Sequence, residues 1–391
     1  MNKTQKHPKI SRHLAGAIAA GKYVHGARLP SEAQLVRQFG VSRPTVRRAL
    51  LDLESEGLIE RRAGSGTYVR SPAAQRSPAR MFGLLVPGLA FTEIFHIICA
   101  EIANLARVHD YGLLWGGSTN PREDTDASLA HAKELCKQFI ARKLSGVFFA
   151  PAEWEPGQEE ANRQLAESLR EAGIPVVLID RDLMGFPSRS DFDLVGLDNM
   201  ASGYLVGEHL IKLGCKRLFF LARPLSAPTV DARIAGVREA LVRHRIESVP
   251  NWVRIGDPAD LKFVRSLTAG HLADAIVCAN DFTAMVLLHS VQSIGLKVPR
   301  DFRLVAFDDV KYATVVSPQL TTIHQPCKDI AATAFRTMME RLAEPSFPAR
   351  NICLTPHLVV RESCGAYLPQ APSATGRRTH TGPLNIPAKA E

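Results

Sequence analysis

The sequence predicts an α/β protein in two parts: a small, mostly helical module that ends in a hairpin, and a large two-lobed body built on parallel sheets. The first observation is charge. The 391 residues carry a net charge of +9, and residues 1–80 hold 15 Lys and Arg against 5 Asp and Glu, whereas the rest holds 33 against 34. The second is a change from helical spacing to strand-like runs near residue 57. The third is a recurrence of short apolar runs after Met81. A basic module on a nearly neutral body indicates an anionic partner for the module.

Three helices are predicted in the module. The first covers 8–20, the second begins after the N-cap residue Ser31 and ends at Gly40, and the third begins after Ser42 with Pro44 in its first turn. The apolar residues expected on the buried face of the third helix are Val46, Ala49, Leu50 and Leu53.

The charges of the third helix run against its own dipole. Its basic residues, Arg43, Arg47 and Arg48, come first, and its acidic residues, Asp52, Glu54 and Glu56, come last. A helix N-terminus carries about half a positive charge, so a merely solvated helix favours the opposite order. An external phosphate would supply the missing negative charge.

A hairpin follows the three helices. The runs "LIERR" and "TYVR" alternate like strands, and "AGSG" at 63–66 favours a tight turn between them. Helix, helix–turn–helix and hairpin together make a winged helix–turn–helix, whose second helix of the pair enters the DNA major groove. Arginines there can bind guanine or phosphate, and Thr45 can contact a thymine methyl. In the wing, Arg61 and Arg62 suit the neighbouring groove.

The segment 28–69, "RLPSEAQLVRQFGVSRPTVRRALLDLESEGLIERRAGSGTYV", resembles the GntR-type DNA-binding domain. The resemblance implies DNA contacts from the start of the third helix and from the wing. The DNA-binding residues we predict are Ser42, Arg43, Thr45, Arg47, Arg48, Gly64, Ser65 and Gly66. Many members carry a basic residue where this chain has Ala33, so we expect one contact of that helix to be missing or relocated.

Composition predicts the domain boundaries. The DNA-binding domain is expected at 1–70, a linker containing Pro72 and Pro78 at 71–80, and the effector-binding and dimerisation domain at 81–363. The remaining residues, 364–391, are rich in Pro, Ala, Thr and Gly and are expected to be disordered.

The body alternates apolar strands with amphipathic helices. The predicted strands form two series: 81–87, 112–116, 146–151 and 174–180, then 194–198, 217–222, 275–280 and 303–309. Such alternation predicts parallel sheets covered by helices on both faces, and two series suggest two lobes.

Polar residues follow several of these strands. They are Asp180 with Arg181, Asn280 with Asp281, and Asp308 with Asp309. Ligands of open parallel sheets bind beyond the carboxyl ends of the strands. Asp281 and Asp309 could equally be helix caps. A cleft lined by Asp, Asn and Arg suits a polyhydroxylated ligand.

The body resembles the LacI/GalR-type regulator core, which is similar to periplasmic sugar-binding proteins. The motifs include "GIPVVLIDRD", "CANDFTAM" and "LVAFDD". The resemblance implies effector contacts from Asp180, Arg233, Asn280 and Asp308, to which we add Arg181.

The first lobe departs from the family pattern. The segment 89–95 lacks the usual Asn-Pro, and Glu93 is expected to replace a contact there. Phe95 and Trp154 either stack on a sugar or pack in the core, and the sequence leaves both alternatives open.

The function predicted is that of a cytoplasmic transcriptional regulator. It is expected to be a homodimeric repressor that binds an inverted-repeat operator in double-stranded DNA and is released by a small sugar-type effector. It is expected to be no enzyme and to need no cofactor or metal. The alternatives are a GntR-type regulator with a pyridoxal-phosphate aminotransferase-like body, whose Schiff-base lysine we do not find, and a sugar-transport protein.

The sequence also argues against a disulfide-bonded or zinc-binding protein and against a secreted or membrane-spanning one. The seven cysteines are scattered without a C-x-x-C pair, which predicts buried free thiols rather than disulfides or zinc. The apolar run 14–20 is too short for a signal peptide, and no stretch reaches the ~18 apolar residues of a membrane span.

Overall fold

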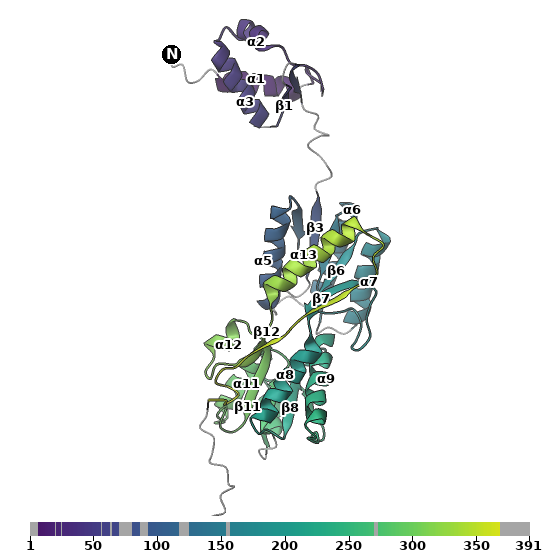
Figure 1. Cartoon of the computed structure of the whole chain (residues 1–391), viewed down its shortest axis with the longest axis vertical. Helices are drawn as coiled ribbons and strands as arrows, with labels where there is room; N and C mark the ends of the chain where they lie inside the picture. Colours follow the sequence, from purple (N-terminus) through teal and green to yellow (C-terminus); the bar gives the residue numbers. More distant parts are fainter. Residues whose placement is uncertain are drawn as a thin grey trace, which may run out of the picture. The chain divides into compact units, whose positions relative to one another are not determined.

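The chain divides into two compact units, Met1–Arg80 and Met81–Glu391. The computed structural model describes residues 7–19, 21–24, 26–55, 57–62, 65–69, 80–86, 93–116, 125–153, 157–269 and 273–367. Almost all of the expected linker and most of the expected tail lie outside these residues. Figure 1 shows the two units, which we describe one at a time.

The first unit has the predicted order of elements. It contains α1 (His7–Ala19), α2 (Glu32–Phe39), α3 (Arg43–Ser55), β1 (Ile59–Arg62) and β2 (Gly66–Val69). The two strands pair antiparallel, which confirms the hairpin. Ser31 and Gln34 form a capping box at the start of α2, and Gly40 ends that helix with φ 60°. The predicted apolar face of α3 is buried among Leu14, Leu35 and Ile59.

The first lobe of the second unit is a parallel sheet with helices on both faces. Its elements are β3 (Met81–Leu85), α5 (Glu93–Val108), β4 (Gly112–Trp115), α6 (Thr125–Ala141), β5 (Gly146–Phe149), α7 (Gln158–Glu171), β6 (Val176–Ile179), β7 (Asp193–Leu197), α13 (Cys327–Ala343) and β13 (Asn351–Leu354). The strand order is β13-β7-β6-β5-β3-β4. Neighbouring side chains of one strand enter different cores: Phe148 packs with α5 and α13, whereas Phe149 packs with α6 and α7. This alternation is why the central strands β3, β5 and β6 are apolar along their whole length.

The second lobe repeats the layout. Its elements are α8 (Asn199–Lys212), β8 (Leu218–Ala222), α9 (Pro228–Arg243), β9 (Val253–Ile255), α10 (Leu261–Thr268), β10 (Ala275–Cys278), α11 (Asp281–Ser293), β11 (Arg303–Asp308), α12 (Lys311–Val315), β12 (Thr321–His324) and β14 (His357–Val359). The strand order is β14-β12-β11-β10-β8-β9, and only β14 on β12 is antiparallel. The α/β class with parallel sheets is thereby confirmed.

The chain crosses between the lobes at three places, after β7, after β12 and after β13 (Figure 1). One sequence interpretation is therefore corrected. The run 194–198 was assigned to the second series of strands, but β7 pairs with β6 and β13 in the first lobe. A continuous apolar run shows that a strand is buried on both faces. It does not show which of two similar sheets the strand joins.

The thiols are free, and most are buried. Five of the seven are buried, Cys99 is half-buried and Cys353 is exposed. Burial raises the pKa of Cys215 to about 11, so its thiol is protonated and unreactive at neutral pH. Across the described ranges, every helix is too short or too polar to span a membrane.

Candidate functional site

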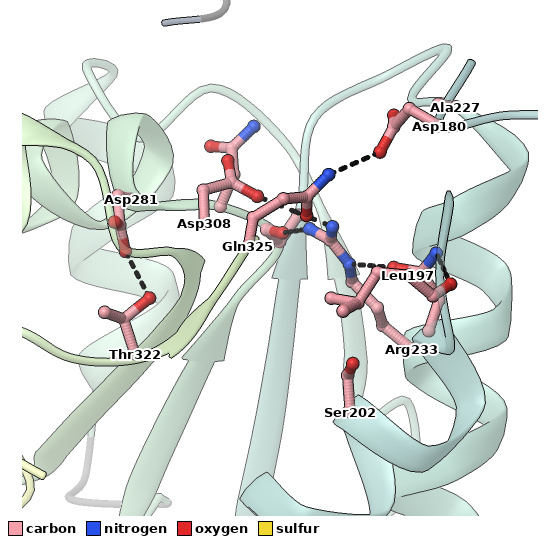
Figure 2. Close-up of polar contacts among 12 residues, drawn as sticks. Asp180, Leu197, Ser202, Ala227, Arg233, Asp281, Asp308, Thr322 and Gln325 are labelled. Carbon is pink, nitrogen blue, oxygen red and sulfur yellow. Dashed lines mark hydrogen bonds and ion pairs between the residues drawn. The ribbon is translucent and has the colours of Figure 1, made fainter. Parts of the chain in front are cut away.

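Polar side chains from both lobes meet at one buried cluster in the second unit. Asp180 follows β6 of the first lobe, Asp308 ends β11 of the second, and Gln325 follows β12 at a crossing between the lobes. Arg233 reaches the same place from α9. Figure 2 shows these residues around the ends of the strands, and all four are at least nine-tenths buried.

Arg233 is held on three sides by the second lobe. Its Nε donates to Asn199 Oδ1 at 2.8 Å, its Nη1 donates to the Ala279 carbonyl at 2.6 Å, and its Nη2 lies 3.5 Å from Asp308 Oδ1. The guanidinium carbon lies 4.6 Å from the centre of the Phe307 ring. The arginine is therefore fixed in place before any ligand arrives.

Arg181 is held in a similar way by the first lobe. Its Nη1 lies 2.8 Å from Glu153 Oε1, and its Nε donates to Asp180 Oδ2 at 3.2 Å. Its guanidinium covers the Phe95 ring at 5.1 Å. The other oxygen of Asp180 accepts from Gln325 Nε2 at 2.7 Å, which joins the first lobe to the crossing segment (Figure 2).

Carboxyl groups outnumber guanidinium groups in this cluster, and one amide oxygen has no donor among the described residues. Burial raises the pKa of Asp308 to about 7, and Arg233 opposes that rise while Asp180 and Glu153 add to it. Gln325 Oε1 is buried without a hydrogen-bond partner in the described part of the chain. A ligand rich in hydroxyl groups could donate to such oxygens, whereas a phosphate would meet carboxylates and arginines that are already paired.

A crevice of about 60 Å³ lies beside the cluster. Both lobes line it, through Asp180 and Arg181 on one side and Asn199, Thr229 and Ala232 on the other. Ligand pockets usually have volumes of about 300–1,000 Å³, so this crevice is too small to hold a sugar as it stands. A sugar would need the two lobes to move apart in order to enter.

The structure places the remaining predicted effector residues differently. Asn280 Oδ1 accepts from the Thr283 amide at 2.8 Å and caps α11. Glu93 Oε2 accepts from the Lys311 amide of the other lobe at 3.1 Å. Phe95 packs in the first-lobe core and also lies under Arg181, so both alternatives for it have support in the geometry. Trp154 lies outside the described residues.

Asp281 and Asp309 were the two possible helix caps. Neither is the N-cap residue of the helix that follows it. Asp281 accepts from Thr322 Oγ1 at 2.7 Å (Figure 2), and burial raises the pKa of its carboxyl group well above the usual value. Asp309 lies 2.9 Å from His324 Nδ1 and 2.6 Å from Arg361 Nη2.

A second candidate surface lies at the start of α3 in the first unit. Ser42, Arg43, Arg47 and Arg48 are exposed, and Thr45 is half-buried. The Ser42 and Thr45 hydroxyls share a 2.8 Å hydrogen bond, so Ser42 orients Thr45. Arg48 lies 3.6 Å from Asp52, whereas Arg43 and Arg47 form no ion pair within the described residues.

The wing residues are partly engaged by the protein itself. Arg61 Nη2 donates to Glu32 Oε1 at 2.5 Å, and Arg62 contacts Glu60. Ser65 is exposed, with its hydroxyl 2.8 Å from that of Tyr68. Gly66 has a φ of 127°, a backbone conformation that residues with a Cβ rarely adopt, which gives that glycine a conformational role in the wing. Gly64 lies outside the described residues.

Comparison with known families assigns both units. Residues 7–69 match the bacterial regulatory proteins of the gntR family, and residues 208–364 match the periplasmic binding protein-like domain. This chain is a regulator that joins a GntR-type DNA-binding domain to a LacI/GalR-type, periplasmic-binding-protein-like domain.

Relatives of this regulator share its organisation to different extents. The "Arabinose metabolism transcriptional repressor" of Geobacillus stearothermophilus is 27% identical over 369 residues, which cover 92% of this chain and 97% of that protein. The "HTH-type transcriptional repressor PurR" of Klebsiella pneumoniae (strain 342) is 31% identical over 195 residues, 49% of this chain and 56% of that protein. The solved "transcriptional regulator CelR-cellobiose complex" has a TM-score of 0.62 and 21% identity, and covers 83% of this regulator and 91% of its own chain. These matches do not favour the aminotransferase-like alternative.

Sequence reasoning missed three residues of the buried cluster: Glu153, Asn199 and Gln325. Glu153 follows the strand that ends at Phe149, and Gln325 follows the strand that ends at His324. The rule that selected Asp180, a polar residue after an apolar strand, could have found both. Asn199 carries the same signal, because it comes two residues after β7, which ends at Leu197.

Proposed function

We propose that this protein is a transcriptional repressor whose DNA-binding domain binds an inverted-repeat operator as a homodimer and whose interlobe cleft binds a sugar that releases it. The observation that carries the proposal is the buried cluster of Asp180, Arg181, Arg233, Asp308 and Gln325, which draws on both lobes. A ligand held by both lobes changes their relative position, and that change is what a regulator can transmit.

The cluster supports an uncharged sugar as the effector. The Arg181 and Arg233 side chains are already paired with protein acceptors. Glu153 and Asp180 already balance the charge of these two guanidinium groups, and Asp308 adds a third carboxyl group that is partly ionised near neutral pH. Added negative charge on a ligand would therefore be repelled, while hydroxyl groups would find acceptors.

The relatives point the same way. The first protein named above is a repressor of arabinose metabolism and spans nearly the whole chain, and the CelR structure contains cellobiose. A repressor of this kind acts in the cytoplasm, on double-stranded DNA.

The test is a panel of ligands added to the full-length protein during thermal unfolding. Arabinose, ribose, cellobiose and glucose represent uncharged sugars, and their phosphorylated counterparts represent anions. An uncharged sugar should raise the melting temperature, because binding to the folded state alone adds RT ln(1 + [L]/Kd) to stability. Asp180→Asn should abolish the shift. Stabilisation by the phosphorylated sugars alone would contradict the proposed ligand class.

A further inference from the structure

Besides the three chain crossings, hydrogen bonds between described residues join the lobes at the cleft. Ala227 N donates to Glu153 Oε2 at 3.0 Å, Lys311 N donates to Glu93 Oε2 at 3.1 Å, and Gln158 Nε2 donates to the Leu225 carbonyl at 3.4 Å. The acceptors in the first two are first-lobe carboxylates, and the donors are second-lobe backbone amides.

The helix that receives Glu153 has no cap of its own. The N-cap residue of α9 is Ala227, which has no side-chain acceptor, and Pro228 follows it. The first amides of a helix lack partners within it, and its N-terminus favours negative charge. A carboxylate of the first lobe therefore supplies the acceptor that the second-lobe sequence leaves out.

Glu153 is also part of the buried cluster. Its Oε1 lies 2.8 Å from Arg181 Nη1, and its side chain is 12% exposed. The helix that it caps carries Arg233. One side chain thus joins an arginine of the first lobe to the helix that positions an arginine of the second.

We propose that Glu153 is an interlobe latch, a positioning residue that holds the lobes closed through the N-terminus of α9 and thereby sets how readily the effector cleft opens. The consequence for effector binding rests on the proposed function, but the latch itself does not. It can be tested without sugar or DNA.

The chemistry of a Glu153→Gln substitution makes the test sharp. Glu153 offers two acceptor oxygens, and each has a donor. Glutamine keeps one acceptor and turns the other atom into a donor, so it loses one of the two contacts. Glu93→Gln is the matched variant: the Lys311 amide uses only one Glu93 oxygen, and the amide oxygen of glutamine can replace it.

The experiment is hydrogen–deuterium exchange with mass spectrometry on the ligand-free full-length protein. Glu153→Gln should speed exchange about tenfold in peptides spanning 223–231 and 180–183. This factor corresponds to the loss of one charge-assisted hydrogen bond. Glu93→Gln, and Glu171→Gln at an exposed position of α7, should leave both peptides unchanged.

A second variant guards against a folding defect. Ala227→Pro removes the donor instead of the acceptor, and the φ of −59° at Ala227 suits proline. Ala227→Pro should also speed exchange at 180–183. The double variant, Glu153→Gln with Ala227→Pro, should exchange no faster there than either single variant. Wild-type exchange in Glu153→Gln, or faster exchange spread evenly over the buried strands β8 and β10, would overturn the latch. Faster exchange in Glu153→Gln, together with the absence of any thermal shift of the wild type with the sugar panel, would instead count against the proposed function and leave the latch standing.

Discussion

The Asp308 carboxyl group shows how one buried side chain links the cleft to pH. Its pKa is raised to about 7 by burial, whereas in an unfolded chain an aspartate titrates near 3.9. Between these values the folded protein holds a proton that the unfolded chain has lost. The free energy of unfolding should therefore fall as the pH rises from about 4 to about 7.

Asp308→Asn should remove this dependence. The stability difference between the wild type and the variant should shift against the wild type by about 2 kcal/mol between pH 5 and pH 7.5. All three tryptophans, at 115, 154 and 252, lie in the second unit, so urea titrations followed by their fluorescence report its unfolding. Asp191→Asn, at an exposed carboxylate, is the control. An equal shift in both variants would argue against the raised pKa.

The arginines of α3 should differ in their effect on DNA binding. Arg43 is exposed without an ion pair in the described residues, whereas Arg48 contacts Asp52. Arg43→Ala should weaken operator binding about 10- to 100-fold, the value of a base contact, and Arg48→Ala only severalfold. Fluorescence anisotropy with a labelled operator, repeated at several salt concentrations, separates base contacts from phosphate contacts. A larger loss of operator affinity in Arg48→Ala than in Arg43→Ala would contradict the placement of Arg43 at the DNA.

At the scale of elements, the closest packing in the second lobe is between α8 and α9. A Cβ at Gly203 would lie 2.0 Å from the Arg233 carbonyl oxygen, and a Cβ at Gly236 would lie 2.0 Å from the Met200 carbonyl oxygen. Two glycines thus let the helix that carries Arg233 approach its neighbour backbone to backbone.

Gly236→Ala should force these helices apart and destabilise the second unit by about 3 kcal/mol. The same urea titration measures the loss, and sugar binding should weaken with it because Arg233 moves. Gly185→Ala, in the same unit, is the control, since a Cβ there would meet only Glu159 Oε1, at an ordinary contact distance of 3.8 Å. A stable Gly236→Ala variant would show that the two helices can separate without cost.

Much of the fold and part of the site could be predicted from the sequence. Repeating apolar runs identified the parallel sheets, and the strand-end rule found Asp180 and Asp308. The rule does not separate local from long-range roles: Asn280 stays a predicted cleft residue, but its Oδ1 already caps α11. The assignment of β7 and the role of Glu153 depend on which lobe receives each segment, and only three-dimensional pairing decides that.

At the scale of the whole molecule, the proposed function couples an effector cleft that can close to a domain that binds DNA. The closed cleft is small, its cluster spans both lobes, and a carboxylate latch holds the lobes together. A sugar changes operator affinity only by the difference between its own affinities for the two arrangements, typically 5- to 150-fold. That coupling is the central claim.

The most direct measurement starts with an operator selected from genomic fragments by the full-length protein. Its complex is then titrated with the uncharged sugar that stabilises the protein. The account predicts an inverted-repeat site whose affinity falls about tenfold or more with that sugar in the wild type, and not in Asp180→Asn. An operator affinity that stays the same while the sugar saturates the cleft would contradict it.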